Sequence, residues 1–417
     1  MLTSPSQPSK SQPDVSQPDM SPGRAPRFGA WPGGWRDSVT TRSAAVGAGL
    51  VSAFIALRLI VTHGASGFVV AGTNFATPSS GLRIFHGGGY DGQFVYRLAH
   101  DPFTHTPTAF GISFDNVSYR QQRIATSFLA HLVDMVPGIS TAWAVLIVNA
   151  LALVLAGVAA THLCADLGRS WRWAPLLAVP ACMPVSLGRD LNEPVAWAAI
   201  LVAILAVRRG RWVAVPAALT VAVLARETSL IVVFAFGLYG LYLLLRRRTE
   251  AWRYLAAVTV PLVVEATWQI HLSHVWGGRI PLLQGTGNNT SAGPFLGVAQ
   301  SFFNGFGDPG LKAKGLAAVY LVDRLVLLAL LIAVAVQVGR RRQPLWSAET
   351  IAWGGAALLA LSLHDWARDV QFLRAAYESW GLSVLILLGA RGRAVNAVLL
   401  GAGLVTVGTM ALYVTRV

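Results

Sequence analysis

Apolar runs long enough to cross a lipid bilayer recur along the chain, and they constrain its fold more than any other feature. The hydrocarbon core of a bilayer is about 30 Å thick, which a helix of about 20 residues spans. Charged residues make up 12% of the chain, against about 25% in a typical soluble protein. We therefore expect an all-α fold, a polytopic transmembrane helical bundle.

Eleven spans are expected in a single transmembrane domain that covers residues 43–417. The runs and their flanking charges place these spans at 43–62, 140–164, 173–187, 195–207, 212–225, 229–245, 254–271, 315–338, 350–363, 377–390 and 395–414. The third span is short and is broken by Pro175, Pro180 and Pro184. Residues 1–42 are rich in Ser, Pro, Gln and Gly and cannot bury a core, so we expect a disordered tail.

The basic residues predict how the bundle is oriented. The tail and the turns on its side of the membrane hold nineteen Lys or Arg and six Asp or Glu, while the rest of the chain holds fourteen and thirteen. Because basic residues concentrate in cytoplasmic loops, the N-terminus is expected in the cytoplasm and the C-terminus outside. The bias toward Ala, Val, Arg and Gly suggests a GC-rich bacterium, and hence its plasma membrane. Topology thus explains the net charge of +14 without nucleic acid as a partner.

Two long external loops are expected, at 63–138 and 272–314, and the first carries the most informative stretch. Three glycines at 87–89 permit a tight turn or positive φ, and Asp91 follows them. A short helix is predicted from Gly92 to about Asp101, with Gln93 and Arg97 on one face. On this motif alone, Asp91 is as readily a cap for that helix as a functional carboxylate.

A second interfacial helix is predicted in the first loop, from Ser118 to Met135, with Arg120 and Arg123 near its start. It belongs to a wider pattern of charges at the outer ends of spans, where ionisable groups usually face a cavity or each other. The clusters are Asp91/Arg97/Asp101, Arg120/Arg123, Arg189/Asp190/Glu193, Arg226/Glu227 and His364/Asp365/Arg368/Asp369/Arg374. In one bundle these clusters can converge near the outer leaflet.

Each cluster also has a purely structural interpretation. Arg189 with Asp190 or Glu193, and Arg226 with Glu227, are equally consistent with ion pairs that lock helices together. The functional interpretation rests on the chemistry of the residue types. Arginines suit a phosphate group at headgroup depth, an apolar groove suits a lipid chain, and a carboxylate can take a proton from a hydroxyl. Together they indicate group transfer from a lipid phosphate at the outer face.

Four short motifs resemble those of a known group of enzymes. They are G-Y-D-G-Q-F at 89–94, Y-R-Q-Q-R-I at 119–124, R-D-L-N-E-P at 189–194 and A-R-E-T at 225–228. With the early external loop and the many-helix bundle, they make the chain similar to the GT-C superfamily of glycosyltransferases. Within it, the chain resembles bacterial membrane proteins of cell-surface glycopolymer synthesis. The resemblance covers residues 44–240 well and the last third only in its general pattern.

The resemblance implies a donor, an acceptor and a mechanism. Such enzymes move a sugar, here mannose or arabinose as a guess, from a polyprenyl-phosphate carrier to a glycolipid or glycan acceptor, usually with inversion. By its position, Asp91 is expected to be the general base that takes the proton of the acceptor hydroxyl. Membrane lipids are expected to surround the site. The residues expected to bind substrate are Tyr90, Gln93, Arg97, Arg120, Arg123, Arg189, Asp190, Glu193, Arg226, Glu227, His364 and Arg368.

Two further questions concern cofactors and the competing class of protein. Some members of the superfamily use a divalent metal, but His271 and His274, at helical spacing, lack a clear third ligand. We therefore expect no metal and no other cofactor. The competing class is a flippase or transporter of a lipid-linked sugar, which also needs an apolar groove and arginines. No clear internal repeat of the transporter kind is present.

Overall fold

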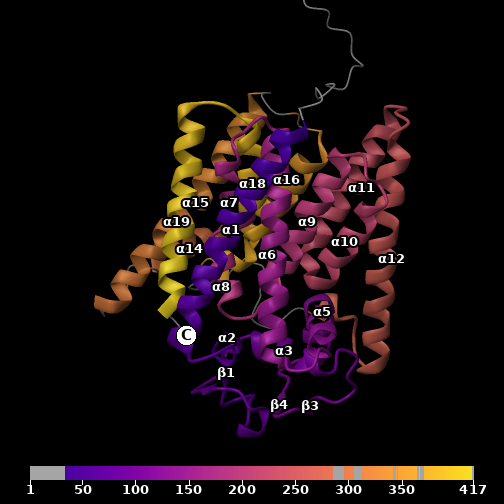
Figure 1. Ribbon diagram of the computed structural model, residues 1–417. Helices are drawn as coiled ribbons and strands as arrows, with labels where there is room; N and C mark the ends of the chain where they lie inside the picture. The colour runs from indigo at the N-terminus through magenta and orange to yellow at the C-terminus, as the bar shows by residue number, and fades with distance from the viewer. Residues whose placement is uncertain are drawn as a thin grey trace, which may run out of the picture. The chain divides into compact units, whose positions relative to one another are not determined.

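The computed structural model describes residues 33–284, 295–304, 311–340, 344, 346–363, 366 and 371–415, with side chains from residue 48 onward except at 284, 301–304, 311–317 and 371 (Figure 1). Contacts between Cα atoms divide the chain into two units, Met1–Ser38 and Val39–Val417. Of the first unit, the described residues are 33–38, which begin helix α1 (Gly33–Thr62). Helix α1 starts at Gly33 and not at Ser43, where the first span was predicted. All that follows concerns the second unit.

The second unit is built from helices, as predicted. Among the described residues, five helical stretches are long and apolar enough to cross a membrane. These stretches are Thr141–Asp166, Glu227–Leu245, Ala251–Val275, Ala318–Gly339 and Arg393–Thr415. The corresponding helices are α6 (Thr141–Asp166), α11 (Leu230–Leu245) preceded by the turn η3 (Glu227–Ser229), α12 (Ala251–Val275), α15 (Leu311–Gly339) and α19 (Arg393–Thr415). The chain is therefore an all-α protein with several helices able to span a membrane.

Shorter helices occupy the remaining predicted spans. They are α9 (Glu193–Arg208), α10 (Ala214–Ala225), α16 (Ala348–Ser362) and α18 (Tyr377–Gly389). The third predicted span is divided into α7 (Ala174–Ala178) and α8 (Met183–Leu187), as its prolines led us to expect. Pro180 lies in the break, because proline lacks the N–H that a continuous helix needs.

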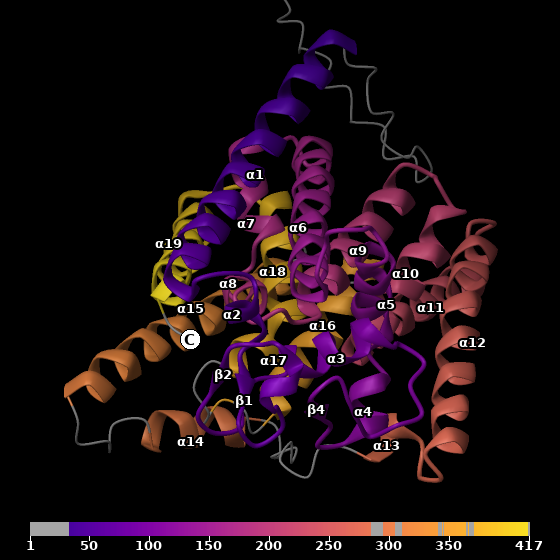
Figure 2. The same cartoon turned by 60° about the horizontal axis from the view of Figure 1, so that its bottom comes forward.

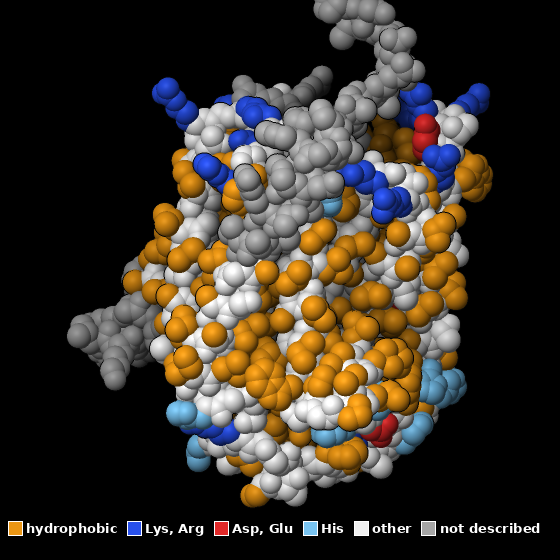
Figure 3. Space-filling model, viewed as in Figure 1, with side chains coloured by type: hydrophobic (Ala, Val, Ile, Leu, Met, Phe, Trp, Pro, Cys, Tyr) orange, Lys and Arg blue, Asp and Glu red, His pale blue; other side chains and the backbone are white. Residues whose placement is uncertain are grey.

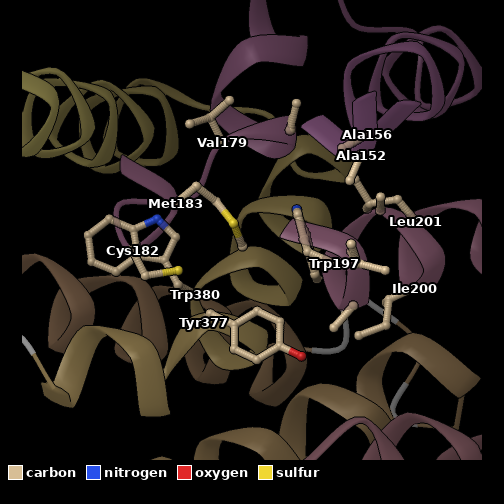
Figure 4. Close-up of a cluster of buried hydrophobic side chains, with 14 of the residues drawn as sticks. Ala152, Ala156, Val179, Cys182, Met183, Trp197, Ile200, Leu201, Tyr377 and Trp380 are labelled. Atoms are coloured by element: carbon tan, nitrogen blue, oxygen red, sulfur yellow. The ribbon is translucent and has the colours of Figure 1, made fainter. Parts of the chain in front are cut away.

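The break between α7 and α8 lies beside the core of the bundle (Figure 4). Trp197 of α9 is fully buried there, and its indole Nε1 donates to the carbonyl of Leu177 at 2.8 Å. Gly381 of α18 faces the same ring, since a Cβ at that position would lie 2.3 Å from Trp197. The absence of a side chain at Gly381 thus lets α9 and α18 approach closely. Tyr377 completes this core edge-on to Trp197, with 6.3 Å between ring centroids.

The unequal lengths of the helices leave space at one end of the bundle. Helices α9 and α10 have 16 and 12 residues, against 26 in α6 and 25 in α12. At 1.5 Å per residue, the first two are about 24 and 18 Å long and the others about 38 Å. Segment 63–138 covers this end of the bundle, and its helix α5 (Ile124–Asp134) lies beneath the ends of α9 and α10, between α6 and α12 (Figure 1).

Segment 63–138 consists of short elements that lie across this end of the bundle (Figure 2). In order, they are α2 (Ser66–Val69), β1 (Ala71–Gly72), η1 (Pro78–Ser80), β2 (Ile84–Phe85), α3 (Gly92–His100), β3 (Thr108–Ala109), β4 (Ile112–Ser113), α4 (Val117–Gln121) and α5 (Ile124–Asp134). Strand β1 pairs in parallel with β2, matching Ala71 to Ile84, and β3 pairs antiparallel with β4, matching Thr108 to Ser113. Helix α3 lies where the first short helix was predicted.

The single helix predicted from Ser118 to Met135 is wrong. The chain leaves helical geometry at Arg123, with φ −91° and ψ 56°, so that α4 and α5 are separate. The interruption directs the side chains of Gln122 and Arg123 toward different helices of the bundle, α12 and η3. Contacts with the bundle therefore override the helical pattern of the segment.

Two close approaches of backbone hold this segment in place. Gly89 has φ +63°, and a Cβ there would lie 2.4 Å from the backbone nitrogen of Gly72. The expected positive φ in the glycine run is thus confirmed, and it lets the run fold against β1. A Cβ on Gly92 would lie 2.1 Å from the carbonyl oxygen of Arg189. The start of α3 is therefore pressed directly against the turn between α8 and α9.

The surface of the bundle separates by residue type along its length. In Figure 3, hydrophobic side chains cover the visible flank, and Lys and Arg side chains gather mostly at the end opposite segment 63–138. Large apolar side chains on the outside of the bundle are strongly exposed, for example Val263 of α12 at 58% and Leu404 of α19 at 75%. An apolar flank between two polar ends is the surface expected of a helical bundle in a bilayer.

Candidate functional site

Asp91 stands at the first position before α3, but its side chain makes no capping hydrogen bond. The capping role considered from the sequence is therefore wrong. The carboxylate instead lies between two arginines, with Oδ1 2.9 Å from Arg120 Nη1 and Oδ2 3.1 Å from Arg374 Nη1. Its side chain is 28% exposed, more than either arginine. The carboxylate is thus held in a fixed position and is still open on one side.

The surroundings of Asp91 keep it ionised. Burial opposes the charged form, but attraction to Arg120, Arg374 and Arg123 outweighs burial and holds the pKa of Asp91 well below its ordinary value. In this state the carboxylate is a weak base, because it gains more from its cations than from a proton. Any ligand that draws these arginines away from Asp91 will raise the pKa of Asp91.

Asp91 belongs to a row of alternating charges that connects segments far apart in the sequence. The row, here called the charged row, runs in the order Asp115, Arg120, Asp91, Arg374, Glu193, Arg226. Arg120 binds Asp115 through two hydrogen bonds of 2.8 and 2.6 Å. Arg374 Nε lies 2.9 Å from Glu193 Oε1, and Glu193, which is fully buried, also pairs with Arg226. Segment 63–138, the starts of α9 and η3, and α17 (Gln371–Ala375) meet in this row.

A second ion pair lies beside the charged row. Arg123 contacts both carboxylate oxygens of Glu227, with Nε 2.7 Å from Oε2, and donates to Tyr119 Oη at 2.6 Å. Glu227 therefore does not pair with its chain neighbour Arg226, as one interpretation of the sequence had it. Adjacent residues at the start of a helical turn point in different directions, and each found its partner on another segment.

Aromatic rings support several of the arginines. Arg189 lies over the ring of Tyr90, with 4.0 Å from Cζ to the centroid, and does not pair with Glu193 as one interpretation predicted. Arg374 lies 5.2 Å from the same ring and 3.3 Å from its hydroxyl. A ring face attracts a cation without neutralising it. The Nε atom of Arg189 is buried and has no hydrogen-bond partner in the described part of the chain, which leaves it available to an anion.

Asp190 is placed behind this group and not in it. It is fully buried with φ +50°, and it lies near Asn149 of α6 and Arg58 of α1. Burial raises the pKa of Asp190 well above its ordinary value, and the two neighbours oppose this only in part. We therefore regard Asp190 as a residue that shapes the turn carrying Arg189, and not as a contact for substrate.

Gln93 and Arg97, two other expected site residues, do not join the charged row. Gln93 is buried and connects loops, since its Oε1 accepts from the Gly72 N–H at 3.1 Å and its Nε2 donates to the Gly88 carbonyl at 2.9 Å. Arg97 is fully buried and donates to Thr104 Oγ1 at 2.7 Å. His364 and Arg368 lie outside the described residues.

Three residues of the site were not among those predicted from the sequence. Arg374 stood in a recognised cluster of charges but was not singled out, although it is the last charged residue before the span predicted at 377–390. Tyr119 is the first residue of the motif that contains Arg120 and Arg123, and Asp115 lies just before that motif. No local pattern marks Asp115, because its role comes from its pairing with Arg120.

No grouping of three His, Cys, Asp or Glu side chains that could hold a metal ion occurs among the described residues. His271, considered as a ligand from the sequence, stacks on Trp268 with 5.3 Å between ring centroids.

Compared with known proteins, the chain matches no family model and no curated protein. The geometry of the charged row is therefore the main indication of function. That geometry offers arginines for an anionic group beside one carboxylate that remains partly exposed.

Proposed function

We propose that the chain is a glycosyltransferase of the GT-C type that moves a sugar from a polyprenyl-phosphate carrier to a glycolipid or glycan acceptor. The observation that carries the proposal is the meeting of four distant segments around Asp91. Each of the four motifs that resemble the superfamily contributes a charged residue to the charged row or to the adjacent pair. These residues are Asp91, Arg120, Arg123, Glu193, Arg226 and Glu227.

The arginines suit the phosphate of the donor. A guanidinium group binds phosphate through two parallel hydrogen bonds and remains charged at any physiological pH. Arg120 and Arg374 flank the exposed side of Asp91, and Arg189 is near Tyr90 with an unused N–H. The leaving group is a phosphate that is already anionic, so that fixed cations stabilise its departure better than a proton donor would.

Asp91 takes the proton of the acceptor hydroxyl in the proposed mechanism. When the donor phosphate shares the positive charge of Arg120 and Arg374, the pKa of Asp91 rises from its lowered value and the carboxylate becomes a stronger base. The acceptor oxygen then bonds to the anomeric carbon as its proton passes to Asp91. The bond from that carbon to the phosphate oxygen breaks, polyprenyl phosphate leaves as the anion, and the configuration inverts.

The finer topology is also part of the proposal. We infer eleven spans in a bacterial plasma membrane, with the N-terminus in the cytoplasm and the charged row at the outer face. The gathering of Lys and Arg at the end opposite segment 63–138 supports this orientation (Figure 3). The reaction is proposed to need no metal or other cofactor, because the arginines supply the charge that the phosphate requires.

Transfer of radiolabelled sugar tests the proposal. Purified full-length protein in liposomes is incubated with polyprenyl-phosphate mannose or arabinose and envelope lipids, and the products are separated. We expect a labelled glycolipid or glycan with the wild type, and a rate about 100 to 10,000-fold lower with Asp91→Asn, which keeps the shape and removes the base. Glu349→Gln is the control, since Glu349 pairs with Arg208 away from the charged row.

Two results would contradict the proposal in different ways. Transfer by well-expressed Asp91→Asn at the wild-type rate would remove the base from Asp91 while leaving an enzyme. Movement of label between leaflets without a new product would instead identify a flippase of the lipid-linked sugar, the competing class considered above.

A further inference from the structure

Two polar residues lie on the inward face of α12, which is otherwise apolar. The buried residues of this helix recur at helical spacing and are Ala251, Ala257, Val258, Pro261, Glu265, Gln269 and Leu272. The opposite face is apolar and exposed, as at Val263. A carboxylate and an amide inside a helix of spanning length are costly, so that such residues usually serve a ligand or one another.

The amide of Gln269 is fully occupied by neighbours. Its Nε2 donates to Glu265 Oε1 at 2.8 Å and to Gln122 Oε1 at 3.2 Å, and its Oε1 accepts from the backbone N–H of Leu282 at 3.0 Å. Gln269 thus joins α12 to the end of α4 and to α13 (Pro281–Gln284), which lie beside it (Figure 2). These bonds fix the position of the Glu265 carboxylate but use only one of its oxygens.

Two buried polar atoms on this stretch of α12 have no partner among the described residues. They are Oε2 of Glu265 and the indole Nε1 of Trp268, which follows Glu265 by one helical turn. Glu265 is only 4% exposed. One atom is an acceptor and the other is a donor. A buried polar group without a hydrogen-bond partner lowers the stability of the folded protein. A hydroxyl satisfies both, because it donates through its hydrogen and accepts through its oxygen.

The surroundings of these two atoms suit a ring that carries hydroxyls. Phe103 packs edge-on against Trp268, with 6.1 Å between ring centroids, so a second aromatic ring lies beside the indole. Sites for small organic ligands combine apolar and aromatic walls with a few polar groups that fix orientation. A sugar presents an apolar ring face and polar hydroxyls. The aromatic surface suits the ring face, and the carboxylate and the indole N–H suit the hydroxyls.

This group of residues adjoins the charged row. Gln122 directly precedes Arg123, which pairs with Glu227. Glu265 is joined to Gln122 through Gln269, so two hydrogen bonds connect it to the segment that carries Arg123. A hydroxyl-bearing group held at Glu265 would therefore lie close to the Arg123–Glu227 pair, which stands beside the charged row.

We propose that Gln122, Glu265 and Trp268 form a subsite for a sugar, here called the α12 subsite. A sugar hydroxyl donates to Glu265 Oε2 and accepts from Trp268 Nε1, while Gln122, through Gln269, holds Glu265 in position. The inference rests on the proposed function for its sugar chemistry, but not on the role of Asp91. The sugar is either that of the donor or that of the acceptor.

Binding of simple glycosides tests the α12 subsite without any phosphate. Saturation-transfer NMR with methyl α-mannopyranoside and methyl arabinofuranoside is measured on full-length protein in nanodiscs. Glu265→Gln keeps the bond to Gln269 and replaces the accepting Oε2 by an amide NH2 group. We therefore expect the affinity for the glycosides to fall at least about tenfold. Trp268→Phe removes the N–H but keeps an aromatic ring, and should weaken binding about threefold or more. Glu349→Gln, the matched change outside the subsite, should bind as the wild type does.

The subsite is overturned if the wild type binds neither glycoside, or if Glu265→Gln binds them equally well. Bare polyprenyl phosphate separates this failure from failure of the proposed function. Binding of that lipid with no effect of Glu265→Gln on the glycosides leaves the donor site and removes the subsite. Binding of the glycosides without binding of the lipid supports the subsite and contradicts the proposed donor.

The same variant identifies the source of the sugar. Polyprenyl-phosphate mannose is compared with bare polyprenyl phosphate, so that the difference in affinity reports on the sugar alone. If Glu265→Gln abolishes this difference, the subsite binds the sugar of the donor. If the difference persists while glycoside binding is lost, the subsite binds the sugar of the acceptor.

Discussion

The carboxylate of Asp91 is held in its ionised form because Arg120 and Arg374 lie on either side of it. A carboxylate in this setting stabilises the fold through its pairs, and it becomes a base only when those pairs are relaxed. Asp91 thus links stability to catalysis in the proposed mechanism, and the two can be measured separately.

The stability contributed by Asp91 should depend on pH in a defined direction. Its pKa is lowered in the folded protein, whereas an unfolded aspartate titrates near 3.9. The contribution is therefore fully present above about pH 4 and is lost as the pH falls through the folded value. We expect the difference in melting temperature between the wild type and Asp91→Asn to be constant from about pH 7 to 5 and to shrink below about pH 4. A difference that grows on acidification would contradict the pairing.

Arg374 joins two carboxylates, Asp91 and Glu193, and its replacement should affect both. Arg374→Gln leaves the buried Glu193 with one cation, and we expect sugar transfer to fall about 100-fold or more together with a lower melting temperature. Arg374→Lys keeps the charge but cannot reach both carboxylates at once. Its rate of sugar transfer should therefore lie between the rates of the wild type and of Arg374→Gln. The values of kcat/KM and the melting temperature of both variants check this.

Arg208→Gln is the control for Arg374. Its partner Glu349 lies near the surface, where an ion pair contributes about 0 to 1 kcal/mol. We expect this variant to retain both transfer and stability. An equal loss at Arg208 and Arg374 would mean that the charged row has no special role.

At the scale of elements, the site depends on short helices that stop early. Helices α9 and α10 are much shorter than their neighbours, and segment 63–138 occupies the space beyond their ends. The contact between Gly92 at the start of α3 and the turn before α9 then brings Asp91 to Glu193 through Arg374. The position of Asp91 is therefore set by packing of backbone on backbone.

Gly92→Ala tests this packing. Its Cβ would lie 2.1 Å from the Arg189 carbonyl oxygen and 2.9 Å from that of Val69, and neither can move without shifting its turn. We expect a loss of about 1–3 kcal/mol in the free energy of unfolding and a lower rate of transfer. Gly157→Ala in α6 is the control, because its Cβ would meet no atom within 4 Å. That variant should be unchanged or up to about 1 kcal/mol more stable.

At the scale of the whole molecule, an apolar flank lies between two polar ends, and Lys and Arg gather mostly at the end opposite segment 63–138 (Figure 3). Labelling with a thiol reagent that does not cross membranes tests the orientation that we infer. Thr108→Cys, in segment 63–138, should react in intact cells, whereas Arg248→Cys, in an arginine-rich turn, should react only after permeabilisation. Both positions are exposed, and the native Cys164 and Cys182 are buried. The opposite pattern of labelling would place the charged row in the cytoplasm.

Much of this fold was predictable because its signals are local. Every predicted span corresponds to a helix, or in one case to two helices, since the length of an apolar run and the charges that end it are written in consecutive residues. Proline breaks between α7 and α8 and the positive φ at Gly89 were predictable for the same reason. The break at Arg123 was not, because the pattern around it is helical and contacts with η3 and α12 decide it.

The sequence by itself determined which charges cannot remain in lipid, and so which residues would gather at the ends of the helices. Only the tertiary structure decided which of them pair. Arg226 binds Glu193 and leaves its neighbour Glu227 to Arg123, and Arg374 reaches Asp91 across more than half of the chain. The physical reason is that burial is a property of each residue, whereas an ion pair depends on the distance between two side chains. That distance is set by the ends of helices that pack against one another, and no local pattern records it.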